Sequence, residues 1–177
     1  MSGTKVAYRY AKSLLELAIE QNNVDAVLQN MIALENVTKE NLDFQLLLKS
    51  PVVNSDKKIS VFRAVFDGFE TLTNAFIDLI TNNGRESYLA DIASSFIALV
   101  KEHKGIVPVT LTSAVALDGQ TKKNILDRLK LTIQGELEVT EKINPELIGG
   151  FILNMGDKQI DASIASQFSN LKQRLTR

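Results

Sequence analysis

The hydrophobic periodicity of this chain changes at Gly105, and the change separates two parts of different fold class. Before Gly105, apolar residues recur every three or four positions, which is typical of helices that bury one face. After it, apolar and other side chains alternate along residues 107–112, which indicates a half-buried strand. We therefore expect a helical domain at residues 1–105 and a mixed domain at residues 106–177.

The first part predicts a compact bundle of six helices joined by short links. Asparagine pairs, a proline and glycines, which interrupt helices, separate the six periodic segments. The expected helices are residues 3–21, a second containing 24–34, 41–49, a fourth capped by Ser55 and Asp56 and ended by Gly68, 70–82, and 86–104.

Helical spacing also predicts which side chains of these helices face the core. They are Ile59, Phe62, Val65 and Phe66 in the fourth helix, Leu72, Phe76, Leu79 and Ile80 in the fifth, and Leu89, Ile92, Ala93, Phe96 and Val100 in the sixth.

The first helix carries a wider apolar arc than one packed face requires. At about 100° per residue, the apolar side chains between Ala7 and Ile19 sweep roughly 200° of its surface. A helix packed on one side needs about half of that arc. Two interpretations remain open: a central helix buried on two sides by its own domain, or a helix with one side open to a partner's helix.

The second part predicts a small α/β domain, in which two helices cover a mixed sheet. Strands are expected at 107–112 and 137–143, with a helix at about 118–133 between them and a hairpin and a final helix after them. Because Pro108 has no N–H to donate, it is expected at a sheet edge or near the start of its strand.

The closing hairpin and helix are predicted from their turn and cap residues. Gly156 and Asp157 suit a tight turn, and Asp161 with Ser163 suits a helix cap. The apolar stripe of the final helix is Ile164, Phe168, Leu171 and Leu175.

Gly149 and Gly150 precede the first strand of this hairpin. A phosphate loop precedes a helix and continues into Gly-Lys-Ser or Gly-Lys-Thr, which is not found here. The two glycines therefore predict a bulge or a close approach of two backbone segments.

The search for catalytic residues yields no constellation. His103 stands beside charged residues near a helix end, where a solvated side chain is expected. Asp157 and Asp161 could form a paired acid site, but their turn and cap roles use both residues. Basic clusters at Lys122-Lys123 and near the C-terminus lack interleaved aromatics and indicate solvated faces. We expect no enzyme activity and no cofactor, metal or nucleic-acid partner.

Composition excludes further classes of protein. Hydrophobic residues make up 45% and charged residues 23% of the chain, which is ordinary globular usage and argues against disorder. The chain has no cysteine, which excludes disulfides and thiolate metal sites. No apolar run approaches the roughly 20 residues needed to span a bilayer. The N-terminus resembles neither a signal nor a transit peptide, so we expect the protein to act where it is made.

Four stretches, in order along the chain, carry a family resemblance. They are Tyr10-Ala-Lys-Ser-Leu-Leu-Glu-Leu-Ala18, Phe76 through Asn83-Gly84-Arg85 to Leu89, Thr112-Ser-Ala-Val-Ala-Leu117, and Leu147-Ile-Gly-Gly150 followed by Gly156-Asp-Lys-Gln-Ile-Asp-Ala-Ser163. Together they resemble the delta subunit of F-type ATP synthases, whose mitochondrial relative is the oligomycin-sensitivity-conferring protein. The resemblance covers nearly the whole chain.

The resemblance implies a non-catalytic adaptor in the peripheral stalk of a proton-translocating ATP synthase, a heteromeric complex. Such a subunit would lie on the cytoplasmic side of the bacterial plasma membrane without spanning it. In this family the helical domain binds the N-terminal helix of one alpha subunit between its first and fifth helices, and the C-terminal domain meets the end of the b subunit. On this chain the groove is expected at Tyr10, Ala11, Leu14, Ile77, Ile80 and Asn83.

The stalk contact is expected within residues 151–163 and on the final helix. Two features depart from the family pattern: Ala162 stands where glycine is common, and the final helix is less basic between residues 165 and 170. Two other function classes were weighed. An enzyme would need Asp157 and Asp161 to converge in a pocket, and a nucleic-acid module would need a basic or aromatic face on the C-terminal sheet.

Overall fold

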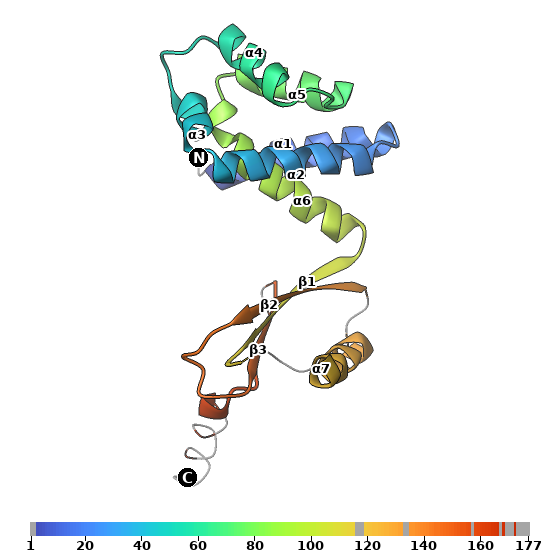
Figure 1. Ribbon diagram of the computed structural model, residues 1–177. Helices are drawn as coiled ribbons and strands as arrows, with labels where there is room; N and C mark the ends of the chain where they lie inside the picture. The colour runs from blue at the N-terminus through green and yellow to red at the C-terminus, as the bar shows by residue number, and fades with distance from the viewer. Residues whose placement is uncertain are drawn as a thin grey trace. The chain divides into compact units, whose positions relative to one another are not determined.

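The computed structural model describes residues 3–115, 119–132, 135–156 and 158–166, together with 168 and 172. The chain divides into two compact units, Met1–Val100 and Lys101–Arg177. Helices make up the first unit and a small sheet with a helix makes up the second (Figure 1). The predicted fold class, a helical bundle followed by a small α/β domain, is confirmed.

The helical unit follows the expected order with small shifts at the helix ends. The sixth helix begins later than predicted, because a short 3-10 helix, η1, takes up its first turn. The elements are α1 (Gly3–Glu20), α2 (Val24–Glu40), α3 (Leu42–Lys49), α4 (Ser55–Val65), α5 (Thr71–Asn82), η1 (Glu86–Tyr88) and α6 (Leu89–His103).

One hydrophobic cluster forms the core of this unit. Every α6 residue predicted to face inward is buried, and Phe96 and Leu89 are completely covered. Phe44 of α3 meets the rings of Phe62 and Phe66 edge-on, at centroid distances of 5.5 and 5.8 Å. These contacts fix α3 against the end of α4, because edge-to-face packing of rings has a preferred geometry.

Two predictions for α4 are wrong. Its N-cap is Asn54 rather than Ser55 or Asp56, and no side chain caps it; Ser55 is already helical and donates its hydroxyl to the carbonyl oxygen of Thr81. Val65, predicted to face the core, is 48% exposed, whereas Lys58 is only 2% exposed. Periodicity alone assigns a lysine to solvent, but this one has partners inside the bundle.

In the second unit, the described strands form one mixed sheet of order β2-β1-β3-β4 (Figure 1). Its β1 pairs in parallel with β2 and antiparallel with β3, which in turn pairs antiparallel with β4. The parallel pair is joined through α7, as parallel strands require a crossover. The elements are β1 (Ile106–Ser113), α7 (Gly119–Thr132), β2 (Glu136–Ile143), β3 (Phe151–Met155) and β4 (Lys158–Asp161).

The sheet buries one face against α7. Val109, Leu111 and Leu153 of the sheet pack with Ile125 and Leu129 of the helix. Ile125 and Leu129 are about one helical turn apart on α7, and they pack with Val109 and Leu111, which are two residues apart on β1 and therefore share one face of the sheet.

Pro108 lies in the central strand β1, two residues after the strand begins. The pairing with β3 starts only at Val109, so Pro108 stands where β1 is paired on the β2 side alone. The missing N–H is tolerated there. Most of the final helix, including Leu171 and Leu175, lies outside the described residues.

Candidate partner-binding surface

The wide apolar arc of α1 has a buried centre and two partly exposed flanks. Five of its side chains are buried: Ala7, Ala11, Leu14, Leu15 and Ala18. On one flank Leu17 is 43% exposed, and on the other Tyr8 is 50% and Ile19 39% exposed. Both interpretations of the arc are therefore partly met, because α1 is packed by its own domain and still shows apolar surface.

The Leu17 flank lies on the side of α1 that meets α5. Tyr10 packs edge-on against Phe76, with ring centroids 6.4 Å apart and an interplanar angle of 72°. Leu17 follows Tyr10 by two helical turns, and Leu72 and Leu79 stand about one turn before and after Phe76. Leu17 therefore lies on the same side of α1 as Tyr10, and Leu72 and Leu79 lie on the same side of α5 as Phe76.

We call this surface the α1–α5 face and define it by Tyr10, Leu17, Leu72, Leu79 and Asn83. Leu79 is 53% exposed, although its spacing predicted a core position. Tyr10 and Leu72 are partly buried and pack against the core cluster. The face thus combines anchored side chains with exposed apolar ones.

The expected groove residues are divided between this face and the core. Tyr10 is partly buried and Asn83 is exposed. Ala11, Leu14 and Ile80 have no exposed surface and Ile77 is 2% exposed, so these four residues belong to the core and have no surface to offer a partner. Sequence reasoning missed Leu17, although it stood at the edge of the apolar arc.

A small basic hollow lies beside Tyr10. Val6, Arg9, Tyr10, Ser13 and Arg85 line it, and its volume is about 210 Å³. Arg85 donates from Nη1 to the Tyr10 hydroxyl at 2.7 Å, and its Cζ lies 5.5 Å from the centre of the Tyr10 ring. The guanidinium is therefore held in place by both a hydrogen bond and a cation–π contact.

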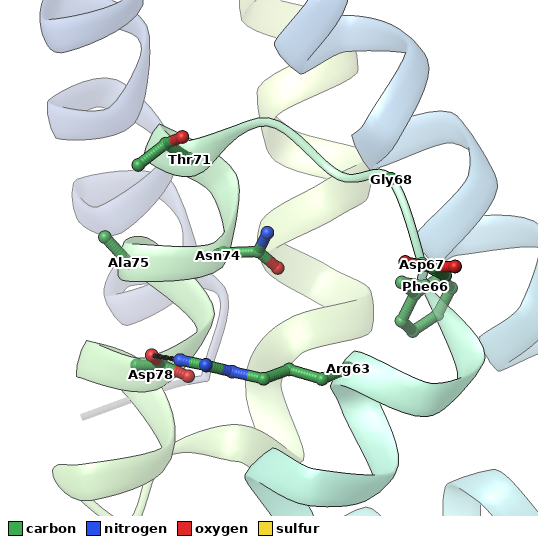
Figure 2. A pocket seen from close by; sticks show the side chains of 8 residues that line it. All are labelled: Arg63, Phe66, Asp67, Gly68, Thr71, Asn74, Ala75 and Asp78. Atoms are coloured by element: carbon green, nitrogen blue, oxygen red, sulfur yellow. Dashed lines mark hydrogen bonds and ion pairs between the residues drawn. The ribbon is translucent and has the colours of Figure 1, made fainter.

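A second hollow, of about 440 Å³, separates α4 from α5 (Figure 2). Arg63 of α4 reaches across it to Asp78 of α5 at 2.6 Å. Asn74 also faces this side, and its amide donates to the Phe69 carbonyl oxygen at 2.8 Å. Arg63 and Asp78 are therefore paired with each other, and the Asn74 amide is paired with the backbone, so these three side chains are already engaged within the helical unit.

The described residues hold no group of three or more histidine, cysteine, aspartate or glutamate side chains suited to a metal ion. In the part of the chain that the structure describes, every helix is too short or too polar to cross a membrane.

Comparison with known proteins gives the family. The family model described as ATP synthase delta (OSCP) subunit matches residues 6–175 of the chain. The chain belongs to this family. The resemblance stated from the sequence is confirmed.

Delta-family relatives match over almost the whole chain. Proteins named ATP synthase subunit delta from Cytophaga hutchinsonii and Christiangramia forsetii are 35% and 33% identical to it over 99% of this chain, and the matches cover 97% and 95% of their own lengths. A chain in a cryo-EM structure of the Toxoplasma gondii mitochondrial ATP synthase hexamer superposes with a TM-score of 0.74 at 25% identity, covering 97% of each chain.

The delta-family stretch Leu147-Ile-Gly-Gly150 has a structural explanation in the second unit. A Cβ atom on Gly149 would lie 2.6 Å from Cδ1 of Ile164, and one on Gly150 would lie 2.4 Å from the carbonyl oxygen of Ala162. The backbone N–H of Ile164 donates to the Gly149 carbonyl oxygen at 3.0 Å. The two glycines therefore stand where the segment after β4 approaches the segment before β3.

Asp161, the last residue of β4, and the serines that follow it form hydrogen bonds at the start of the final helix in this delta-family chain. Asp161 Oδ1 accepts from the backbone N–H of Ser163 at 2.8 Å, and Oδ2 accepts from the Ser166 hydroxyl at 2.5 Å. The Ser163 hydroxyl oxygen accepts from the backbone N–H of Ser166 at 3.3 Å. Gly156 ends β3 with a φ of 55°, and Asp157 lies outside the described residues.

Asp161 is exposed and does not suit general acid catalysis. The hydroxyls of Ser163 and Ser166 and the backbone N–H of Ser163 lower its pKa. A general acid that works near neutral pH needs a raised pKa instead. The paired-acid alternative is therefore not favoured.

The described part of the sheet's polar face carries acidic side chains, which do not favour a nucleic-acid module. Its β2 strand exposes Glu136 and Glu138, which would repel phosphates.

Proposed function

We propose that this chain is the stator adaptor of an F-type ATP synthase, joining the catalytic alpha/beta head to the b subunit of the peripheral stalk. Rotation of the central shaft exerts torque on the head, so a stator must hold the head still for ion flow to remain coupled to ATP synthesis. That task needs static contacts between subunits and no bond chemistry. The subunit itself is non-catalytic in this proposal.

The head contact is the α1–α5 face, which binds the N-terminal helix of one alpha subunit. The observation that carries this assignment is the exposure of Leu17 and Leu79, 43% and 53%, on the two helices that the Tyr10–Phe76 contact joins. An amphipathic helix would cover both leucines with its apolar side. Leu14 and Ile80 form the floor beneath and keep the two helices in position.

The stalk contact is the end of the second unit. Exposed apolar side chains gather along its last segments: Ile148 at 82%, Ile160 at 46%, Ile164 at 38% and Phe168 at 69%. Apolar surface of this kind suits the end of a stalk helix from b. Through that contact the subunit lies at the cytoplasmic side of the bacterial plasma membrane.

Affinity purification of the tagged chain from its native cells tests the assembly. The alpha, beta and b subunits are expected to accompany the chain in stoichiometric amounts. If the ATP synthase in these cells is intact and its alpha, beta and b subunits do not accompany the tagged chain, the proposal is contradicted.

Binding of a synthetic alpha-subunit N-terminal peptide tests the head contact. Leu17→Asp and Leu79→Asp should each weaken binding at least tenfold, because burying an apolar anchor contributes roughly 1.5–3 kcal/mol. Leu46→Asp on α3 is the matched control, since Leu46 is also exposed, at 58%, and lies off the face. Unchanged affinity in the folded Leu17 and Leu79 variants would remove this assignment.

A further inference from the structure

The charges along α1 run opposite to the order that its own dipole favours. Lys5 and Arg9 lie in its first half, Lys12 lies just past its midpoint, and Glu16 and Glu20 lie in its last turns. The first turn has no acidic residue and the last turn has no basic one. Because a helix N-terminus favours negative charge and a C-terminus positive charge, this order destabilises α1 slightly. The stability of the helix itself therefore does not account for this order.

Arg9 of α1 and Arg85, the residue before η1, share the basic hollow. Arg9 and Arg85 both line it, together with the Ser13 side chain. Among the described residues neither arginine forms an ion pair, and the one hydrogen bond described for their guanidinium groups is that from Arg85 to Tyr10. Most of their N–H donors are thus left for an acceptor that comes from outside.

The guanidinium of Arg85 is preorganised. The Tyr10 hydroxyl and ring hold it, and Tyr10 is itself held by the edge contact with Phe76. A cationic group already fixed in place loses little conformational freedom when it binds an anion. At about 210 Å³ the hollow is smaller than most sites for nucleotides or drug-sized ligands, and it suits one carboxylate.

We propose that this hollow binds an Asp or Glu side chain of the helix that docks on the α1–α5 face. The contact would fix the direction and register of that helix, with its acidic residue beside Arg9 and Arg85 and its basic residues toward Glu16 and Glu20. Apolar contacts alone allow a helix to slide or to reverse, whereas charge complementarity selects one arrangement. This inference rests on the proposed head contact and names the chemistry of the partner.

Peptide binding to the full-length chain tests the inference. Arg9→Gln and Arg85→Gln should each lower the affinity for the alpha-subunit N-terminal peptide by about five- to twentyfold, because a charge-assisted contact is lost. They should also reduce the dependence of affinity on salt concentration. A peptide with Asp and Glu changed to Asn and Gln should bind the parent chain more weakly and be insensitive to both substitutions.

Three further variants separate the explanations. Lys57→Gln removes an exposed cation of α4 and should bind normally. Tyr10→Phe removes the hydrogen bond that holds Arg85 but keeps the ring and both charges, so its affinity should fall by less than that of Arg85→Gln; an equal or larger loss would show that the Tyr10 hydroxyl, and not the charge of Arg85, makes the contact. If Leu79→Asp abolishes binding while both arginine variants bind normally, the carboxylate site is wrong and the head contact stands. If Leu79→Asp also binds normally, the head contact itself fails and the inference falls with it.

Discussion

Nζ of Lys58 lies 2.5 Å from Oε1 of Glu86, and this ion pair is buried in the helical unit. The two side chains are only 3% and 13% exposed. Nζ also donates to the carbonyl oxygens of Leu48 and Ser50, at 3.3 and 2.7 Å. One lysine therefore joins α4, the end of α3 and η1, and it satisfies carbonyl groups that α3 leaves unpaired at its C-terminus.

Removing this lysine should destabilise the helical unit strongly. Lys58→Met leaves the Glu86 carboxylate buried without a cation, and we expect the free energy of unfolding to fall by about 3 kcal/mol. Urea denaturation followed by circular dichroism measures the change. The double variant Lys58→Met/Glu86→Leu should recover much of the loss, because no charge is then left buried. Lys57→Met, at an exposed neighbouring position, should stay within about 0.5 kcal/mol. A small effect of Lys58→Met would show that water reaches the pair.

The Arg63–Asp78 pair should contribute little by comparison. Its atoms lie 2.6 Å apart, but the Arg63 side chain is 63% exposed and that of Asp78 is 27% exposed. Solvent screens such a pair, so Asp78→Asn should lower the free energy of unfolding by less than about 1 kcal/mol. The same urea experiment measures it, and a loss as large as that of Lys58→Met would contradict this reading of Figure 2.

Gly150→Ala should destabilise the second unit by more than about 2 kcal/mol. The residue has a φ of 81°, and the new Cβ would lie 2.4 Å from the Ala162 carbonyl oxygen, so strain and a steric clash add together. Gly156→Ala is the matched control, because Gly156 has a φ of 55° but no atom within 4 Å of the new Cβ. It should cost only the strain, about 1 kcal/mol. Thermal denaturation measures both variants, and equal midpoint temperatures would argue against the close approach of the two backbone segments.

The Asp161 carboxylate should stabilise the second unit in a pH-dependent way. The hydroxyls of Ser163 and Ser166, and then the Ser163 backbone N–H, lower its pKa below the ordinary value of 3.8. Because the folded-state pKa is the lower one, the stabilisation is complete above the unfolded-state pKa and is lost as the pH falls through the folded-state pKa.

Thermal denaturation of the parent chain and of Asp161→Asn, recorded at pH 7 and at pH values below 3.8, measures this effect. The parent should be more stable at pH 7, and the difference should shrink in acid. A difference that is constant with pH would show that the charge of Asp161 plays no part.

The most regular helices could be predicted closely from the sequence. For α6, all five predicted core residues are buried, because its apolar stripe is narrow and Gly105, with a φ of 68°, ends the segment. The strand period after Gly105 likewise predicted β1, whose Val109 and Leu111 are buried. These features depend on neighbours within a few residues, which a single sequence contains.

The edges of the apolar stripes could not be predicted in this way. Spacing placed Leu79 in the core and the family resemblance placed Leu14 in an open groove, whereas Leu79 is 53% exposed and Leu14 is fully buried. Periodicity locates the centre of an apolar face, but the helices that pack beside it decide which flank stays open. The assignment of the binding surface to α1 and α5 stays a prediction of the family resemblance, and the residues exposed on these helices became known only from the packing.

The sequence by itself determined the order of helices and strands, the change from helix to sheet at Gly105, and the family, because each is recorded in local spacing or in motifs. Only the tertiary structure decided that Lys58 is buried against Glu86, 28 residues away, and that Arg85 is held by Tyr10, 75 residues away. The physical reason is that the energy of a charged or half-buried side chain depends on the partners that folding brings to it, and those partners lie far off along the chain.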